Sequence, residues 1–398
     1  MKKIMKKSVK ALSFVTALAF AIMGFCGIYE QSRIPDEIYL PNDGNIGIED
    51  VFPVKIQGIA TEMPDEIALK SGNKLKLKLV SLGGSAVKNV SVNVVDRKWL
   101  VPSGQPFGIK MFTEGVMVVG MSDIDTGEKI VNPAKDAGLK TGDIITTLNG
   151  KKVLFNEQVE KIVAENGNKK IKAEYMRNGV SKIALINPVY SKDDKTYKIG
   201  IWVRDSSAGI GTMTYIDPNS GRFAGLGHGV CDMDTDELMP LRSGEISDVV
   251  ITGVKKGYKG KPGELKGMFT SSYDIGHIEM NDETGIYGDI KANYCKNKAV
   301  PIAYKEEIHT GKAKILATLD GAEPCEYDII IEKINNSGNT KNMIIKASDS
   351  VLLDKAGGIV QGMSGSPILQ DGKLIGAVTH VFVNDPTRGY GIFIENMV

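Results

Sequence analysis

The sequence has few of the residues that hold metals or build disulfide frameworks. Of its 398 residues only four are cysteines and four are histidines, and no two cysteines are spaced as CxxC. Cys231, Cys295 and Cys325 are too scattered to supply metal-ligand spacing, even with His228 close to Cys231. We therefore expect no metal and no other cofactor, and the sequence does not decide whether a disulfide forms.

The sequence also lacks an excess of charge of either sign. It carries 49 basic and 48 acidic side chains, so its composition gives no electrostatic reason to expect a nucleic-acid partner. Aromatic residues make up 7%, whereas glycine is abundant at 45 residues. This composition is typical of β-rich domains with many tight turns, and the length allows two or three of them.

The N-terminus is the exception to this even composition. Five lysines between Lys2 and Lys10 precede an apolar run from Ala11 to Tyr29. A basic flank before a segment near spanning length is the pattern of a secretory signal or an uncleaved anchor. Residues 1–30 are therefore predicted to be a signal-anchor, which leaves the rest of the chain outside the cytoplasm. Residues 31–100 read as a linker followed by a small β region.

The next segment, residues 101–190, resembles a bacterial-type PDZ domain. The stretch "NPAKDAGLKTGDIITTLNG" is close to that family's pattern, and "NEQVEKIVAEN" has apolar residues at helical spacing. The resemblance places a carboxylate-binding loop at "PFGIKM", around Phe107, Gly108 and Ile109. Such a domain binds the C-terminus of an extended peptide by strand addition beside its helix.

The remainder, residues 191–398, is a series of short apolar strands that predicts a barrel or a sandwich. Near its end, "GMSGSP" precedes a strand, a tight Asp371-Gly372 turn and a second strand. Glycines around Ser364 would let the loop project a hydroxyl and aim the amides of Gly362 and Ser364 at one point. A serine nucleophile and its oxyanion hole need this arrangement, although a flexible loop has the same composition.

A serine nucleophile needs a base, and imidazole has the appropriate pKa. His228, in "FAGLGHGVCD", has flanking glycines that leave it accessible. His277 alternates with apolar residues, His309 lies in a polar setting, and His380 is too near Ser364 in sequence to face it. These considerations favour His228 as the general base.

The segments "GLGHGVCD" and "GGIVQGMSGSPILQDGKLIGAVTHVFVNDPTRGYGIFIE" resemble the SpoIVB (stage IV sporulation protein B) peptidase family. The order of anchor, PDZ-like segment and C-terminal domain extends this resemblance over essentially the whole chain. The resemblance implies a mainly β, multidomain protein ending in a chymotrypsin-like β-barrel serine peptidase domain. It also implies Ser364 as nucleophile and His228 as base.

The acidic member of the triad has more than one candidate. The resemblance points to Asp349 in "IIKASDSVLLD", whereas chain order in a two-barrel chymotrypsin-like fold favours Asp274. Asp354 is a third option. We take Asp349, whose role would be to orient His228 and to stabilise its protonated form.

The resemblance also implies a biological role. Members of the family are exported from the forespore into the space between its two membranes, where they cleave a regulator of an intramembrane protease. That cleavage triggers activation of a late mother-cell sigma factor. Because the peptidase is tethered beside a pliable linker, we also expect it to cleave itself between Gln31 and Val101. The alternative reading is a catalytically inactive, membrane-tethered PDZ adaptor that acts by binding alone.

Overall fold

The computed structural model describes residues 36–42, 59–62, 72, 74–81, 86–291 and 297–398. The expected anchor at residues 1–30 lies outside them. Within the described ranges, no helix has both the length and the apolar character needed to cross a membrane. The chain divides into two compact units, Met1–Lys98 and Trp99–Val398.

The first unit contains a four-stranded sheet in the order β1-β4-β3-β2. β1 runs parallel to β4, and the other neighbours are antiparallel. Val90, Val92 and Val94 alternate along β4 and are buried, as the period of a half-buried strand requires. The strands are β1 (Glu37–Pro41), β2 (Ile59–Glu62), β3 (Lys74–Ser81) and β4 (Ala86–Val95).

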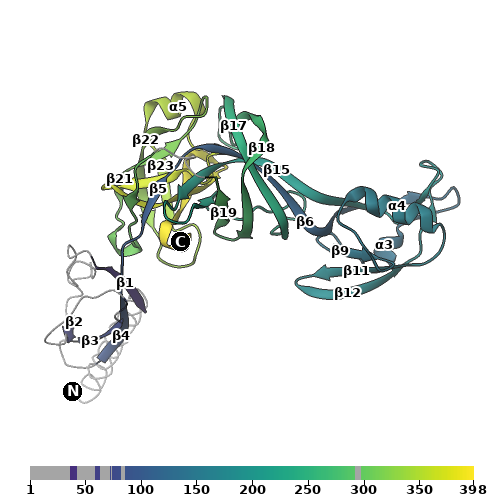
Figure 1. The fold of residues 1–398 in the computed structure, drawn as a ribbon, viewed down its shortest axis with the longest axis horizontal. Helices are drawn as coiled ribbons and strands as arrows, with labels where there is room; N and C mark the ends of the chain where they lie inside the picture. Colours follow the sequence, from purple (N-terminus) through teal and green to yellow (C-terminus); the bar gives the residue numbers. More distant parts are fainter. Residues whose placement is uncertain (1–35, 43–58, 63–71, 73, 82–85, 292–296) are drawn as a thin grey trace, which may run out of the picture. The chain divides into compact units, whose positions relative to one another are not determined.

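The second unit begins with a six-stranded barrel in the order β6-β17-β18-β19-β16-β15, closed because β15 also pairs with β6 (Figure 1). Its core includes Phe107, Phe223 and Ile246. The strands are β6 (Pro106–Met121), β15 (Ile201–Ile216), β16 (Arg222–Gly225), β17 (Leu241–Lys255), β18 (Glu264–Asp282) and β19 (Gly285–Ile290). β5 (Trp99–Pro102) and β20 (Val300–Pro301) continue the sheet from β15.

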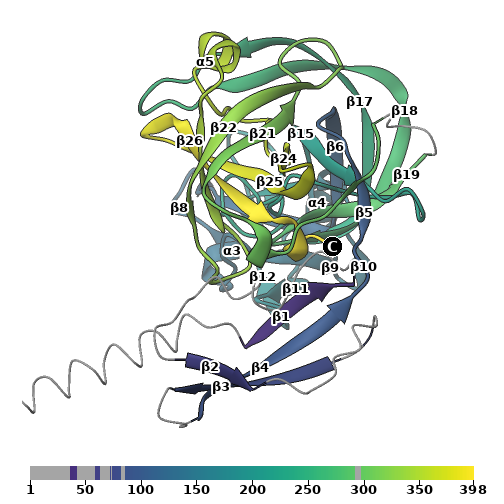
Figure 2. The ribbon, with the colours of Figure 1, turned by 90° about the vertical axis from the view of Figure 1, so that its left-hand side faces the viewer.

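A second closed barrel follows, in the order β21-β22-β23-β26-β25-β24, and it faces the viewer in Figure 2. Its own hydrophobic core includes Ile315, Ile345 and Phe393. The elements are β21 (Gly311–Ala317), β22 (Cys325–Ile334), β23 (Met343–Ala347), α5 (Ser350–Ala356), β24 (Pro367–Gln370), β25 (Lys373–Phe382) and β26 (Asp385–Phe393). Short 3-10 turns, η1 (Lys305–Glu307) and η2 (Ile394–Asn396), lie before β21 and after β26. Two successive six-stranded barrels make the C-terminal part chymotrypsin-like, as expected.

The PDZ-like part is inserted into the first barrel rather than preceding it. The chain leaves the barrel along β6 and returns along β15, so both strands are shared (Figure 1). A separate core that includes Val116, Ile145 and Ile171 holds the insertion together. Its further elements are β7 (Ile124–Asp125), β8 (Ile130–Val131), α3 (Pro133–Asp136), β9 (Ile144–Leu148), β10 (Lys151–Lys152), α4 (Asn156–Asn166), β11 (Ile171–Arg177), β12 (Val180–Ile186), β13 (Val189–Tyr190) and β14 (Tyr197–Lys198).

This insertion changes the domain boundaries that the sequence suggested. We expected a PDZ domain over 101–190 and a peptidase domain from 191 onward. In the structure, Pro106 to Thr113 of β6 pair within the first barrel, and only the rest of β6 turns toward β9. The barrel therefore takes its first strand from a segment that lies before the PDZ-like part in the sequence.

Candidate active site

Ser364 lies in a tight loop immediately before β24 of the second barrel. Gly362 and Gly365 on either side of it both have φ of 96°, a conformation that residues with a side chain rarely adopt. A Cβ at Gly365 would lie 1.8 Å from the carbonyl oxygen of Thr212, so this position also requires glycine for space. The Ser364 hydroxyl is half-buried and donates a hydrogen bond of 2.5 Å to the carbonyl of Thr379.

The amides of the predicted oxyanion hole are free of protein acceptors. Among the described residues, the N–H groups of Gly362 and Ser364 donate no hydrogen bond, whereas the amide of Gly365 donates to Val378 O. Two neighbouring unpaired amides beside a serine hydroxyl can receive an oxyanion. The role of Gly362 and Ser364 in an oxyanion hole remains a prediction that this geometry supports.

His228 lies in the loop just after β16, a strand of the first barrel. Its Nδ1 is 2.8 Å from the carbonyl of Gly229, and since a carbonyl only accepts, this nitrogen carries the proton. The other nitrogen, Nε2, is then the basic one. Burial lowers the pKa of His228, the Gly229 carbonyl partly opposes this, and the positive charge of Lys341 lowers the pKa further.

The two barrels bring the flanks of Ser364 and His228 into contact. A Cβ at Gly365 would lie 2.5 Å from the backbone nitrogen of Leu226, two residues before His228. A Cβ at Gly227 would lie 3.1 Å from Cγ2 of Thr379, whose carbonyl accepts from Ser364. The loops that carry the predicted nucleophile and base therefore approach each other beside β25, and the Ser364 hydroxyl is bonded to Thr379 rather than to His228.

His380 is a site residue that sequence reasoning set aside. Its ring stacks on that of His228, with centroids 4.4 Å apart. Partial burial lowers the pKa of His380 to about 4, and repulsion from His228 and Lys341 adds to the effect, although part of the side chain is exposed. The signal was in the sequence: a tight turn after β24 folds β25 back, and Val378 N donates to Ser366 O. Because β24 and β25 form a hairpin, His380, two residues after Val378, must lie near the loop that carries Ser364.

None of the three candidate triad acids is bonded to His228 in the structure, and Asp354 lies within α5. Asp349 is the N-cap of α5, where its Oδ1 accepts from the amides of Val351 and Leu352 at 2.9 and 3.0 Å. Asp274 lies within β18, eight residues before Asp282, whose carbonyl is close to Gly229. Eight residues of strand span roughly 25 Å, which places Asp274 far from the histidine. Across the described part of the chain, His228 hydrogen-bonds no carboxylate.

The expected carboxylate-binding loop at Phe107, Gly108 and Ile109 is wrong. These residues lie in the barrel half of β6, paired with β15 on one side and β17 on the other. Phe107 is completely buried and Ile109 nearly so. Because the backbone is paired on both edges, it has no free amides for a ligand.

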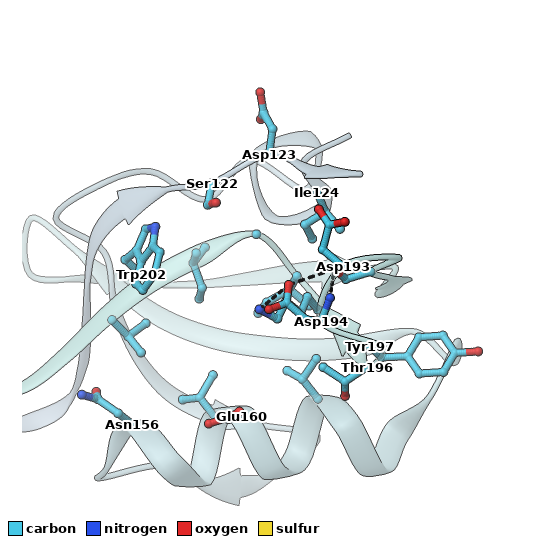
Figure 3. Close-up of a pocket in the computed structure, with 18 of the residues that line it drawn as sticks. Ser122, Asp123, Ile124, Asn156, Glu160, Asp193, Asp194, Thr196, Tyr197 and Trp202 are labelled. Atoms are coloured by element: carbon cyan, nitrogen blue, oxygen red, sulfur yellow. Dashed lines mark hydrogen bonds and ion pairs between the residues drawn. The ribbon is translucent and has the colours of Figure 1, made fainter. Parts of the chain in front are cut away.

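A groove lies instead along α4 of the PDZ-like part (Figure 3). It has a volume of about 480 Å³ and runs between α4 and the stretch from Tyr197 to Val203. Ile201 to Val203 pair with β6 on one edge, and their other edge faces α4. Val159 and Val163 supply apolar surface on the helix side, and Trp202, 66% exposed, stands at one end.

The described residues contain no group of three or more His, Cys, Asp or Glu side chains arranged to hold a metal. Cys231 and Cys325 are free thiols on the surface, and Cys295 lies outside the described residues.

Residues 195–398, half of the chain, match the family model described as SpoIVB peptidase S55. The chain belongs to the SpoIVB peptidase family. The match covers both His228 and Ser364, and it begins at residue 195, just before β14 of the PDZ-like insertion. The protein is thus a peptidase of a sporulation family.

Two further similarities are more limited. A "Putative zinc metalloprotease" of Clostridium acetobutylicum is 37% identical over 89 residues, which are 21% of this chain and 26% of that protein. The alignment thus spans about a quarter of the relative's length. The PDZ domain of an SdrC-like protein from Listeria monocytogenes is 22% identical over 23% of this chain and 87% of that chain, with a TM-score of 0.19.

Proposed function

We propose that this peptidase is a serine endopeptidase in which Ser364 is the nucleophile and His228 the general base. The observation that carries the proposal is the meeting of the two residues' flanking loops at the junction of the barrels, with unpaired amides at Gly362 and Ser364. The burial that lowers the pKa of His228 supports it, because a base must be neutral to accept a proton.

The proposed reaction begins when the Ser364 hydroxyl exchanges the Thr379 carbonyl for Nε2 of His228. Its oxygen then attacks the scissile carbonyl while Nε2 takes the proton, and the Gly362 and Ser364 amides hold the oxyanion. The imidazolium returns that proton to the leaving amine. Water, deprotonated by His228, then releases the acyl group from Ser364.

Asp349 remains our proposed acid on the strength of the family motif. To act in this way, its carboxylate must approach His228 in the substrate complex, because it caps α5 in the structure. If it does not, the Gly229 carbonyl takes over the orientation of the imidazole.

We further propose that the protein acts in sporulation signalling from outside the cytoplasm. In this proposal the N-terminal basic and apolar segment exports and anchors it in the forespore intermembrane space. There it cleaves itself and a membrane regulator of an intramembrane protease, which leads to sigma-factor activation. The support is family membership together with the N-terminal sequence pattern.

The experiment compares the wild type with Ser364→Ala for self-cleavage and for cleavage of fluorescein-labelled casein. We expect shortened forms and fluorescent fragments from the wild type, and neither from Ser364→Ala at an unchanged Tm. Loss of the nucleophile costs several orders of magnitude in rate. Equal proteolysis by the two proteins would favour the alternative, an inactive PDZ adaptor, with a contaminating protease as the source of cleavage.

A second proposed activity belongs to the groove along α4, where the open edge of β15 can accept an extended peptide C-terminus by strand addition. Its lining carries six carboxylates and one lysine, Lys198, which already pairs with Asp194. This charge favours peptides with Lys or Arg beside the docked residues.

Fluorescence anisotropy should show tighter binding to this groove of a lysine-containing peptide than of the same peptide with glutamate in place of lysine. Equal binding of the two peptides would contradict this preference. The six carboxylates are those of Asp123, Asp125, Glu157, Glu160, Asp193 and Asp194.

A further inference from the structure

The nucleophile loop of the second barrel is held by a strand of the first. Three hydrogen bonds run from β15 to this loop. The Thr212 amide donates to Ser364 O at 2.9 Å, and the Thr212 hydroxyl donates to Gly362 O at 2.8 Å. The Thr214 hydroxyl donates to Gly365 O, also at 2.8 Å. Both threonines are buried, so these bonds are shielded from water.

Strand geometry explains why both hydroxyls point to the loop. Thr212 and Thr214 are two residues apart on β15, so their side chains project from the same face. Met213 between them projects from the other face, into the core of the first barrel. Met213 thus packs in the core of the first barrel, while the hydroxyls of Thr212 and Thr214 bond to the loop of the second barrel.

The threonine bonds complete a set in which every carbonyl of the loop has a partner. Gln361 O accepts from Leu265 N, and Met363 O accepts from Ser366 N. The carbonyls of Gly362, Ser364 and Gly365 accept from the two threonines. In a planar trans peptide the N–H points opposite to the C=O of the preceding residue, so the Gln361 and Met363 carbonyls set the directions of the Gly362 and Ser364 amides. The carbonyls of Gly362 and Ser364 fix the peptide planes on the other side of these two residues.

We infer that Thr212 is a positioning residue for the oxyanion hole. Its hydroxyl and amide hold the carbonyls of Gly362 and Ser364, so it fixes the peptide planes that follow the two residues whose amides would hold the oxyanion. Leu265 N and Ser366 N fix the planes that precede them. Its hydroxyl thereby limits rotation of the glycine-rich loop about Gly362, which would turn the amide of that residue away from an oxyanion. The inference rests on the proposed function, since it requires Ser364 to be the nucleophile.

A change of one hydroxyl tests this inference. Thr212→Val keeps the shape of the side chain and removes the hydrogen bond to Gly362 O, whereas Thr212→Ser keeps the bond. Thr113→Val is the matched control: Thr113 is also a buried threonine of the first barrel, and its hydroxyl bonds to Gly115 O away from the loop. Thr214→Val is a second loop variant that leaves Thr212 intact.

The measurement is the labelling of the full chain by a fluorophosphonate probe. Ser364 Oγ forms a bond to phosphorus, fluoride leaves, and His228 takes the hydroxyl proton, so the maximal labelling rate reports on the aligned loop. We expect Thr212→Val to lower this rate about 10- to 100-fold with little change in probe affinity, because small misplacements of a catalytic geometry have such effects. Thr212→Ser should restore the rate, and Thr214→Val should lower it less.

The outcomes separate this inference from the proposed function. If Thr212→Val and Thr113→Val label at the same maximal rate, Thr212 has no positioning role and the inference is wrong. If Thr212→Val does not fold, an unchanged rate in Thr214→Val together with a slowed rate in Thr212→Ser would overturn it. If the wild type is not labelled, or Ser364→Ala is labelled equally fast, the assignment of Ser364 itself fails.

Discussion

The imidazole rings of His228 and His380 lie stacked, with centroids 4.4 Å apart and planes inclined by 34°. One ring comes from the first barrel and the other from the second, so the contact exists only when the barrels are docked. The stack covers one face of the proposed base. It thereby contributes to the burial that lowers the pKa of His228.

Removing the His380 ring is therefore expected to change the pH dependence of catalysis. In His380→Ala, water reaches His228, its protonated form becomes more stable, and its pKa rises toward the usual value of about 6.5. The acid limb of the kcat/KM profile should move to higher pH, which makes the variant weaker at pH 6 than at pH 8 relative to the wild type.

The control for this prediction is His309→Ala. His309 is exposed and pairs with Asp371 on the surface, so its removal should leave the acid limb in place. An acid limb that does not move in His380→Ala would show that the stack does not tune the base.

Asp349 can be tested for its two roles with two substitutions. Asn and Asp are equally good helix N-caps, so Asp349→Asn should keep the Tm, whereas Asp349→Ala should cost about 1 kcal/mol of stability. If Asp349 is the triad acid, Asp349→Asn also loses most of its kcat, because the amide cannot stabilise the imidazolium. Full activity of Asp349→Asn would leave a Ser364–His228 dyad oriented by the Gly229 carbonyl.

Glu306 should make stability depend on pH in a distinctive way. Both of its carboxylate oxygens are buried and find no hydrogen-bond partner among the described residues, and burial raises its pKa to about 7. A carboxyl with a raised pKa stabilises the folded state at low pH, and this contribution is lost as the pH rises through the folded-state value.

Glu306→Gln removes the charge while keeping the shape. The variant should therefore become more stable than the wild type as the pH rises from 5 to 8, by up to about 3 kcal/mol in the free energy of unfolding. Its Tm should rise relative to that of the wild type over the same range. The neighbouring substitution Glu307→Gln breaks an ion pair with Lys373 and should bring no such gain. A pH-independent difference for Glu306→Gln would contradict the prediction.

Gly365→Ala should prevent the nucleophile loop from docking on β15. The new Cβ would overlap the Thr212 carbonyl oxygen at 1.8 Å, in addition to the cost of a positive φ. We expect loss of probe labelling and a clear fall in Tm. Gly372→Ala is the matched control, since Gly372 also has a positive φ but nothing within 4 Å, and it should cost only about 1 kcal/mol. Equal effects in the two variants would show that the close approach is unimportant.

The local sequence was sufficient for the features that depend on neighbours in the chain. The glycine-bracketed Ser364 motif, the alternating strands of the last 200 residues and the helix at Asn156–Asn166 all follow from short-range patterns. The glycines flanking His228 likewise marked it as a candidate. The strand and helix predictions were confirmed because side-chain periodicity acts within a few residues, whereas the roles of Ser364 and His228 stay predictions.

Only the tertiary structure decided which distant residues meet. Phe107 has the local pattern of a PDZ loop, but pairing with β15 and β17 places it in the barrel core. The Thr212 hydroxyl bonds to a carbonyl 150 residues later in the chain, and no local pattern predicts such a contact. His380 reaches His228 because two separately closed barrels dock against each other. Sheet closure and barrel docking bring residues together through long-range strand pairing. The sequence therefore indicated the candidates Ser364 and His228, and only the fold determined that Thr212 and His380 lie beside them.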